Sequence, residues 1–307
     1  MPVSIQFQIT PCVSKIIGLQ PKSVLDVGCG FGKWGYLCRE YLDAFNGRFR
    51  PEDWTTRIDA VEYFEPYILD HQRALYDNIM IGDIRDLCDG LDEYDLIIAG
   101  DVIEHMHKDE AELVVETLYT KAKQMLIVNI PLGEGWDHPE QYGNPAELHR
   151  SEWYKEDFQG YALEFDEFTL PTGLAYGAFY CPKKLPGGQQ VSGFLSAAEF
   201  YSQRQELATA ERYARRALMS DPSALEALYM MVDIQVNQGN VDGAVEVLLA
   251  GVSANPASAT PRLYLAQLLD AKGQRSEACR HLQEAAALKD IEADIRTQVD
   301  ALLAAWA

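Results

Sequence analysis

The sequence predicts two parts of different fold class: an α/β part with a seven-stranded, mostly parallel sheet and an antiparallel edge strand, then an all-α part of helical repeats. Up to about residue 183, short β-branched runs alternate with helical stretches, which is typical of βαβ units. Beyond that point the strand patterns end, and an Ala-rich helical pattern repeats every 34 residues. The 307 residues are enough for two separate cores.

The elements of the first part follow from hydrophobic runs and their spacing. Strands are expected at residues 23–27, 58–63, 79–82, 94–99, 125–130, 164–170 and 175–181. Helices are expected at residues 33–44, 66–76, 108–122 and 151–160. Helices between successive strands predict a parallel sheet covered on both faces, which is a Rossmann-like arrangement. The last two strands have no helix between them, so they predict the antiparallel edge.

Composition sets the domain boundaries. Residues 184–193 contain Pro, three Gly and few apolar side chains, which indicates a linker. We therefore predict an N-terminal domain at 1–183 and a helical-repeat domain at 194–307.

The 34-residue register of the second part is visible in small residues. They recur at Ala210, Ala244 and Ala278, and again at Ala217, Gly251 and Ala285. This pattern resembles the tetratricopeptide repeat, which implies small residues where paired helices cross and prolines, here Pro222 and Pro256, at the turns between units. The third unit lacks that proline, and residues 291–306 predict a closing helix over the last repeat.

Charge and apolar runs exclude several classes of partner. The 47 acidic and 26 basic residues give a formal charge of −21, and residues 194–307 hold only 15 and 10 of them. The first part is therefore strongly acidic and would repel a phosphate backbone, so no nucleic-acid partner is expected. The sequence also predicts no membrane span, no secretory signal, and scattered reduced cysteines, which together favour a cytoplasmic protein.

The strongest local motif joins the first strand to the first helix. Gly28, Gly30 and Gly32 follow the strand and permit a tight turn with close approach of a ligand to the backbone. Gly30, Gly32 and Gly35 also fit G-x-G-x-x-G, so a dinucleotide site is an alternative. Asp26 lies two residues before the first glycine, where it would repel a diphosphate and attract a ligand that carries an ammonium and a sulfonium.

This strand and loop resemble the first motif of class I S-adenosylmethionine-dependent methyltransferases, and the resemblance implies S-adenosylmethionine as the cofactor. It further implies that Glu62, at the end of the second strand, accepts both ribose hydroxyls. Asp83 would take the adenine amino group while the Ile84 backbone reads the ring. Asp101 and Val102 begin the segment after the fourth strand and are expected at the same cofactor site.

Methyl transfer displaces a neutral leaving group from a sulfonium, so the enzyme mainly aligns the acceptor and excludes water. A base helps when the acceptor holds a proton, and histidine titrates near neutrality. His105 follows the fourth strand, and His149 resembles the family's histidine before an aromatic-bearing helix that includes Trp153. We predict both histidines as catalytic residues, with loop capping and support of the cofactor as their alternative roles. The resemblance spans roughly residues 20–183.

Residues 131–150 form a connection too long for a simple loop, which suits a lid over the acceptor. Trp136, His138 and Tyr142 are predicted to stack on and hydrogen-bond a polar ring such as a sugar. No metal is expected, because Asn129 lacks the adjoining acid of metal-dependent, catechol-type methyltransferases. The alternative is a divalent ion bound by acids and histidines of the lid: Asp137, His138, Glu140, Glu147 and His149.

The sequence thus favours an enzyme that methylates a small polar acceptor, with oxygen favoured over nitrogen as the acceptor atom. The repeats are expected to bind a protein partner, to form a homodimer, or to wall the active site. One alternative is a non-catalytic scaffold that serves the repeats, and its signature would be loss of the cofactor acids. The other is an NAD-dependent oxidoreductase, which Asp26 and the long spacing from Gly30 to Glu62 disfavour.

Overall fold

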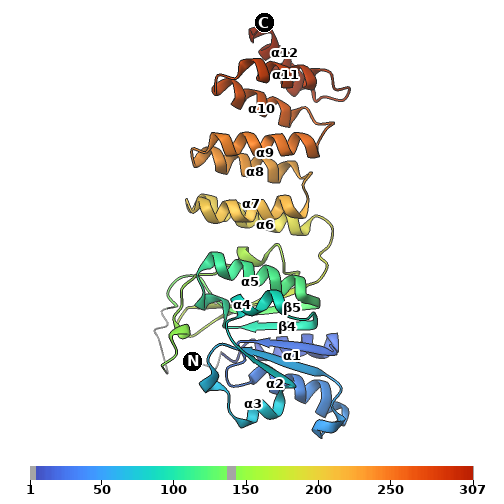
Figure 1. Ribbon diagram of the computed structural model, residues 1–307, viewed down its shortest axis with the longest axis vertical. Helices are drawn as coiled ribbons and strands as arrows, with labels where there is room; N and C mark the ends of the chain where they lie inside the picture. Colours follow the sequence, from blue (N-terminus) through green and yellow to red (C-terminus); the bar gives the residue numbers. More distant parts are fainter. Residues whose placement is uncertain (1–4, 137–142, 307) are drawn as a thin grey trace. The chain divides into compact units, whose positions relative to one another are not determined.

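The computed structural model describes residues 5–136 and 143–306. Its contacts divide the chain into two compact units, Met1–Pro186 (unit 1) and Gly187–Ala307 (unit 2). Unit 1 is α/β and unit 2 is helical, which confirms the predicted fold class (Figure 1). Helix α6 (Gln189–Gln203) begins inside the stretch 184–193 that composition indicated as a linker.

Unit 1 is built on one seven-stranded sheet with the order β3-β2-β1-β4-β5-β7-β6. The strands are β1 (Ser23–Val27), β2 (Arg57–Glu62), β3 (Asn78–Ile81), β4 (Tyr94–Gly100), β5 (Ala122–Leu132), β6 (Glu164–Thr169) and β7 (Ala175–Pro182). The first five strands pair in parallel, and β7 runs antiparallel to both β5 and β6. The strand order reverses direction between β1 and β4, where open α/β sheets bind ligands.

Helices cover both faces of this sheet (Figure 1). They are α1 (Ile9–Leu19), α2 (Lys33–Cys38), α3 (Asp70–Leu75), α4 (Ile84–Leu87) and α5 (Lys108–Lys121). On one face, Ile16 of α1 and Trp34 of α2 pack with Val24 and Leu96 in a common core. The sequence analysis missed α1 and the short α4.

The predicted helix at 151–160 is wrong, because only a 3₁₀ turn forms there, at Lys155–Phe158. The Asp157 carboxylate accepts hydrogen bonds from the Tyr154 amide at 2.8 Å and from Lys108 Nζ at 2.7 Å. Both bonds hold the acid at the start of the turn, and Trp153 and Phe158 are buried on either side of it. The apolar residues of 151–160 are thus buried by a short capped turn, although their spacing is also compatible with a helix.

The helix that begins with α2 continues as a π-helical turn, Arg39–Asp43, around a buried ion pair. Arg39 Nη1 lies 2.8 Å from Asp43 Oδ2, and the two side chains are 4% and 0% exposed. The guanidinium also donates to the carbonyls of Thr56 and Leu75, and it stacks on the Trp54 ring. This network joins α2 to the segments before β2 and β3.

Unit 2 consists of seven helices in sequence among its described residues. They are α6, α7 (Leu207–Ser220), α8 (Leu225–Asn237), α9 (Val241–Ala254), α10 (Thr260–Ala271), α11 (Arg275–Ala286) and α12 (Ala293–Trp306). The small residues of the repeat are buried where helices cross. A Cβ on Gly251 of α9 would lie 2.4 Å from Leu228 Cδ2 of α8, so the close crossing depends on glycine.

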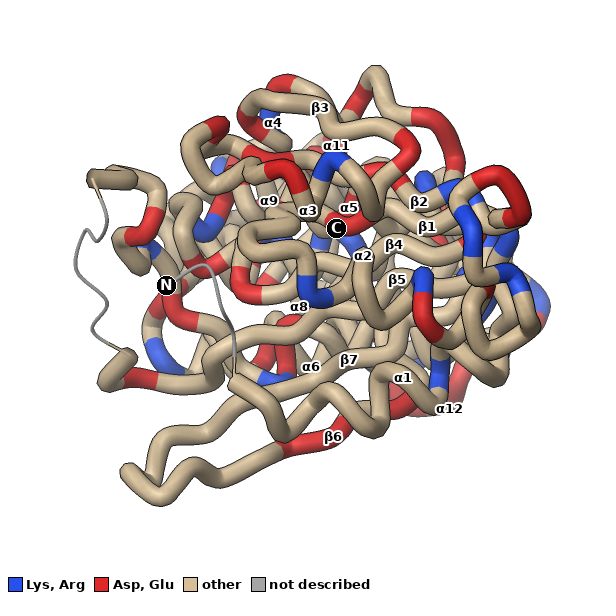
Figure 2. Tube along the Cα trace, turned by 90° about the horizontal axis from the view of Figure 1, so that it is seen from below, with Lys and Arg blue, Asp and Glu red and all other residues tan. Residues whose placement is uncertain are grey.

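The acidic residues of the described part of the chain are distributed over many segments and are not concentrated in one (Figure 2). Figure 2 shows Asp and Glu spread over many loops and helices, with Lys and Arg interspersed. Within residues 5–136 and 143–306, every helix falls short of the length and apolar character that a bilayer crossing demands.

Candidate active site

A pocket of about 390 Å³ opens at the carboxyl ends of the parallel strands of unit 1. Its walls come from the loops after β1, β2, β3 and β4 and from the segment 144–150. Seven of the nine residues predicted to bind the cofactor line it: Gly28, Gly30, Glu62, Asp83, Ile84, Asp101 and Val102. Because parallel strands end at one edge of the sheet, residues distant in the sequence meet in this pocket.

The loop after β1 requires glycine for two separate reasons at Gly28. Its φ of +69° lies in the left-handed region, and a Cβ there would approach Val102 Cγ2 to 2.4 Å. Gly32 also has a positive φ, of 87°, but it lies outside the pocket lining and forms the N-terminal cap of α2. Gly28 therefore sets the distance between the β1 and β4 loops.

The amides of this loop are already used by acceptors within the protein. The Val61 carbonyl accepts from the amides of Gly28 and Cys29, at 2.9 and 3.2 Å. Glu62 Oε2 accepts from the Gly30 amide at 2.9 Å. A phosphate cradle needs such N–H groups directed at the ligand. Here a carboxylate and a carbonyl hold them instead.

Asp26 lies beneath the loop rather than in the pocket lining, and its side chain is 1% exposed. Tyr76 Oη donates to Asp26 Oδ2 at 2.5 Å and accepts from the Gly35 amide at 3.2 Å. Burial raises the pKa of Asp26 from 3.8 to about 7. A Cβ on Gly35 would lie 2.3 Å from the Tyr76 ring, so Gly35 serves the packing of Tyr76 and lies outside the pocket.

Glu62 ends β2 and Asp83 lies two residues beyond the end of β3, and each carboxylate is held in place by the protein. Glu62 Oε1 accepts from the Phe64 amide at 2.9 Å, and burial raises the pKa of Glu62. Asp83 caps α4, and the Arg85 guanidinium binds both of its oxygens, at distances from 2.6 to 3.1 Å. The hydrogen bonds from Arg85 lower the pKa of Asp83. Both acids keep lone pairs for a ligand, since each oxygen can accept more than one hydrogen bond.

Lys33 is a pocket residue that the sequence analysis did not select. Burial lowers the pKa of Lys33, while the charges of Asp101 and Asp26 oppose this change. Asp101 has a left-handed φ of 56°, and its Oδ1 accepts from Tyr176 Oη at 2.8 Å. A signal for Lys33 was present in the sequence, because it is the first helical residue after the glycine loop.

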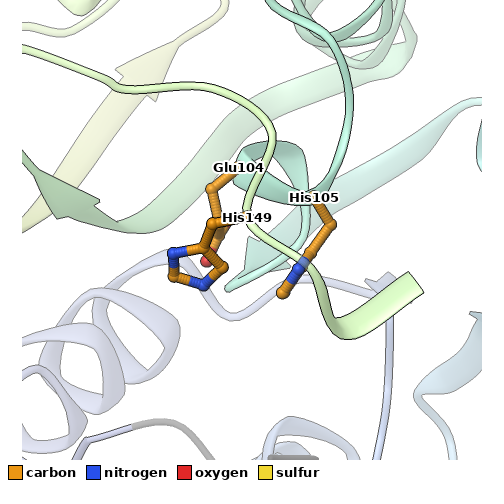
Figure 3. Close-up of side chains that lie close together, drawn as sticks. All are labelled: Glu104, His105 and His149. Carbon is orange, nitrogen blue, oxygen red and sulfur yellow. The ribbon is translucent and has the colours of Figure 1, made fainter. Parts of the chain in front are cut away.

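His105 lines the pocket. The His149 ring packs against the His105 ring, with the two ring centroids 4.9 Å apart and the ring planes at 71°. His149 itself is outside the pocket lining. The amide of Arg150 donates to the Glu104 carbonyl at 2.8 Å, and this bond brings the two histidines together. Figure 3 shows both rings beside Glu104, a residue that the sequence analysis did not select.

Of the predicted acceptor residues, the structure describes only Trp136. Trp136 Nε1 donates to the carbonyls of Leu132 and Ala175, both at 3.1 Å, and Trp136 lies outside the lining. His138 and Tyr142 lie outside the described residues. The part of the predicted lid that lines the pocket is residues 144–147 and Arg150, fixed by a 2.8 Å hydrogen bond from Tyr67 to Glu147.

Comparisons with known proteins give one family match and several likenesses of fold. The tetratricopeptide repeat family model matches residues 202–259. No curated protein matches the chain. TehB from Haemophilus influenzae is 16% identical with a TM-score of 0.41, over 59% of this chain and 63% of TehB.

Two further solved structures resemble one part of the chain each. The magnesium protoporphyrin IX methyltransferase ChlM from Synechocystis PCC 6803, solved with bound SAM, is 13% identical with a TM-score of 0.40, over 58% of this chain and 85% of ChlM. The Yersinia enterocolitica chaperone SycD, solved with a peptide of the translocator YopD, is 18% identical with a TM-score of 0.34, over 39% of this chain and 94% of SycD. Likeness at this level says nothing about what this chain binds.

Proposed function

We propose that unit 1 binds S-adenosylmethionine and transfers its methyl group to a hydroxyl of a small polar acceptor such as a sugar or a natural product. The observation that carries the proposal is the use of the loop amides by Val61 and Glu62. The pocket combines a strand-end acid for a ribose with a glycine loop whose amides cannot cradle a diphosphate. This combination favours a nucleoside cofactor without phosphate groups over NAD.

The charged groups of the pocket fit the parts of that cofactor. Glu62 is assigned to the two ribose hydroxyls, and Asp83 with Ile84 to the adenine. The Lys33 ammonium is assigned to the carboxylate of the methionine part, since it is a cation in the pocket wall. Asp101 provides the opposite charge for the ammonium and the sulfonium. The charged methionine part of the ligand is thus matched by side chains of opposite charge.

The acceptor is assigned to the side of the pocket formed by His105 and residues 144–147. The acceptor oxygen forms a bond to the methyl carbon while the carbon–sulfur bond breaks, and the electron pair stays on sulfur as a neutral thioether. The hydroxyl must also lose its proton, which is why basic groups beside the pocket favour oxygen as the acceptor atom. His105 and His149 are the basic groups at this position.

The test is isothermal titration of the full chain with S-adenosylhomocysteine, with NADH as a parallel ligand. We expect micromolar binding of S-adenosylhomocysteine alone. Glu62→Ala should weaken it about 10- to 100-fold, because it removes hydrogen bonds to a charged acceptor. Glu65→Ala is the matched control, since Glu65 is exposed and outside the lining. Binding of NADH, or of neither ligand, would overturn the proposal.

A second role is proposed for unit 2, on the repeat-family match to residues 202–259. Helical repeats present extended surfaces that bind peptides or a second copy of the chain. Light scattering of the full chain across a concentration series tests self-association. A mass that rises to that of a dimer supports self-association, and a constant monomer mass contradicts it.

A further inference from the structure

Glu104 is a buried acid whose carboxyl group forms no hydrogen bond with the described residues. It is 1% exposed, and neither Oε1 nor Oε2 has a hydrogen-bond partner among the described residues. Burial and the nearby charge of Asp101 raise the pKa of Glu104. A buried carboxyl group with both oxygens unsatisfied is strongly unfavourable, so such a group in a folded protein calls for an explanation.

Two imidazoles lie beside this carboxylate. Glu104, His105 and His149 each offer one ligand atom, and these atoms all lie within 4.8 Å of one another. Figure 3 shows the Glu104 side chain next to the His149 ring, with His105 projecting into the same space. Glu104 and His105 belong to the turn Ile103–His105 after β4, and the Arg150 amide holds the His149 segment against that turn.

We propose that Glu104, His105 and His149 bind a divalent transition-metal cation, Zn²⁺ in the first instance, with an open coordination position that faces the pocket. Two imidazole nitrogens and one carboxylate oxygen are a ligand set that zinc uses in catalytic sites, whereas Mg²⁺ prefers oxygen ligands alone. The cation would give the buried carboxylate its missing partner. Because His105 lines the pocket, the open position is accessible from there.

The task of this cation rests on the proposed function. It binds the acceptor's hydroxyl oxygen and lowers the pKa of that hydroxyl, whose proton passes to solvent. The oxygen then attacks the methyl carbon, the carbon–sulfur bond breaks, and its electron pair remains on sulfur. In this form the two histidines act as metal ligands and not as general bases. The inference also departs from the sequence analysis, which expected no metal.

The test uses the full chain stripped with EDTA and titrated with Co²⁺, whose visible absorption reports coordination by nitrogen and oxygen ligands. We expect one saturable site per chain, and loss of its absorption when Zn²⁺ displaces Co²⁺. Glu104→Gln keeps the shape of the buried side chain, and His149→Gln changes a half-buried ligand on another segment. Each variant should weaken Co²⁺ binding by more than about 100-fold, beyond the effect of losing a supporting group.

The control variant is His71→Gln, which removes an exposed histidine outside the cluster and should leave Co²⁺ binding unchanged. Circular dichroism of each variant reports folding, and His149→Gln keeps the test valid if Glu104→Gln does not fold. Absence of a Co²⁺ site, or equal binding by the wild type and both ligand variants, would overturn the metal site. Titration of the same samples with S-adenosylhomocysteine separates the two proposals. Co²⁺ binding without that ligand retains the metal site and refutes only the proposed function.

Discussion

Replacement of Gly28 by alanine perturbs the glycine loop at the point where the structure leaves no room for a side chain. The φ of +69° costs an alanine about 1–2 kcal/mol. The added Cβ would lie 2.4 Å from Val102 Cγ2, and relief of such overpacking costs about 1–3 kcal/mol more. We therefore expect Gly28→Ala to lower the free energy of unfolding of unit 1 by about 2–5 kcal/mol.

Chemical denaturation followed by tryptophan fluorescence measures this change, since four of the five tryptophans precede residue 187. The double variant Gly28→Ala/Val102→Ala should recover the steric part and retain the backbone part, which a double-mutant cycle separates. Gly18→Ala is the control, because Gly18 lies in α1 with nothing within 4 Å of its added Cβ. Additive effects of the two substitutions would refute the predicted contact between the β1 and β4 loops.

Three further predictions concern buried groups. Because the pKa of Asp26 is raised to about 7 in the folded state, its favourable contribution is present below its unfolded pKa of about 3.8 and is lost as the pH rises toward 7. The free energy of unfolding relative to Asp26→Asn should thus fall by about 4 kcal/mol between about pH 4 and pH 8 in denaturant titrations, and a constant difference would contradict this. Gly251→Ala should destabilise unit 2 by about 1–3 kcal/mol in thermal unfolding, with a smaller loss in a Leu228→Ala background. Asp43→Asn should lower stability by about 1.5–3 kcal/mol because it removes one charged partner of the buried Arg39 while Asp77 remains, and an unchanged midpoint would count against a buried ion pair.

The fold was largely predictable because period and spacing encode it. Alternating β-branched runs and helical stretches define a parallel sheet, and the 34-residue register defines paired helices. Helix α1 was not predicted because it precedes the first strand, so no connection between two parallel strands required a helix there. The helix at 151–160 was wrongly predicted because the apolar spacing allows a helix there. The hydrogen bonds of the Asp157 side chain favour a capped turn instead.

The site was predictable where it follows strand ends and not where it depends on packing. Glu62 ends β2 and Asp83 lies just beyond the end of β3, so a rule about sheet edges suffices to place them in one pocket. The Asp26 carboxylate accepts a hydrogen bond beneath the loop from Tyr76, which follows α3 and lies 50 residues further along the chain. The meeting of Glu104 with His149 depends on a backbone hydrogen bond between two loops, and no periodicity in either loop encodes it.

The most direct test of the account is a crystal structure of the full chain with S-adenosylhomocysteine. The account predicts the ligand in the pocket of unit 1, with both ribose hydroxyls hydrogen-bonded to Glu62, the adenine amino group at Asp83, and the carboxylate at Lys33. A ligand bound elsewhere, or one whose ribose hydroxyls do not reach Glu62, would contradict it.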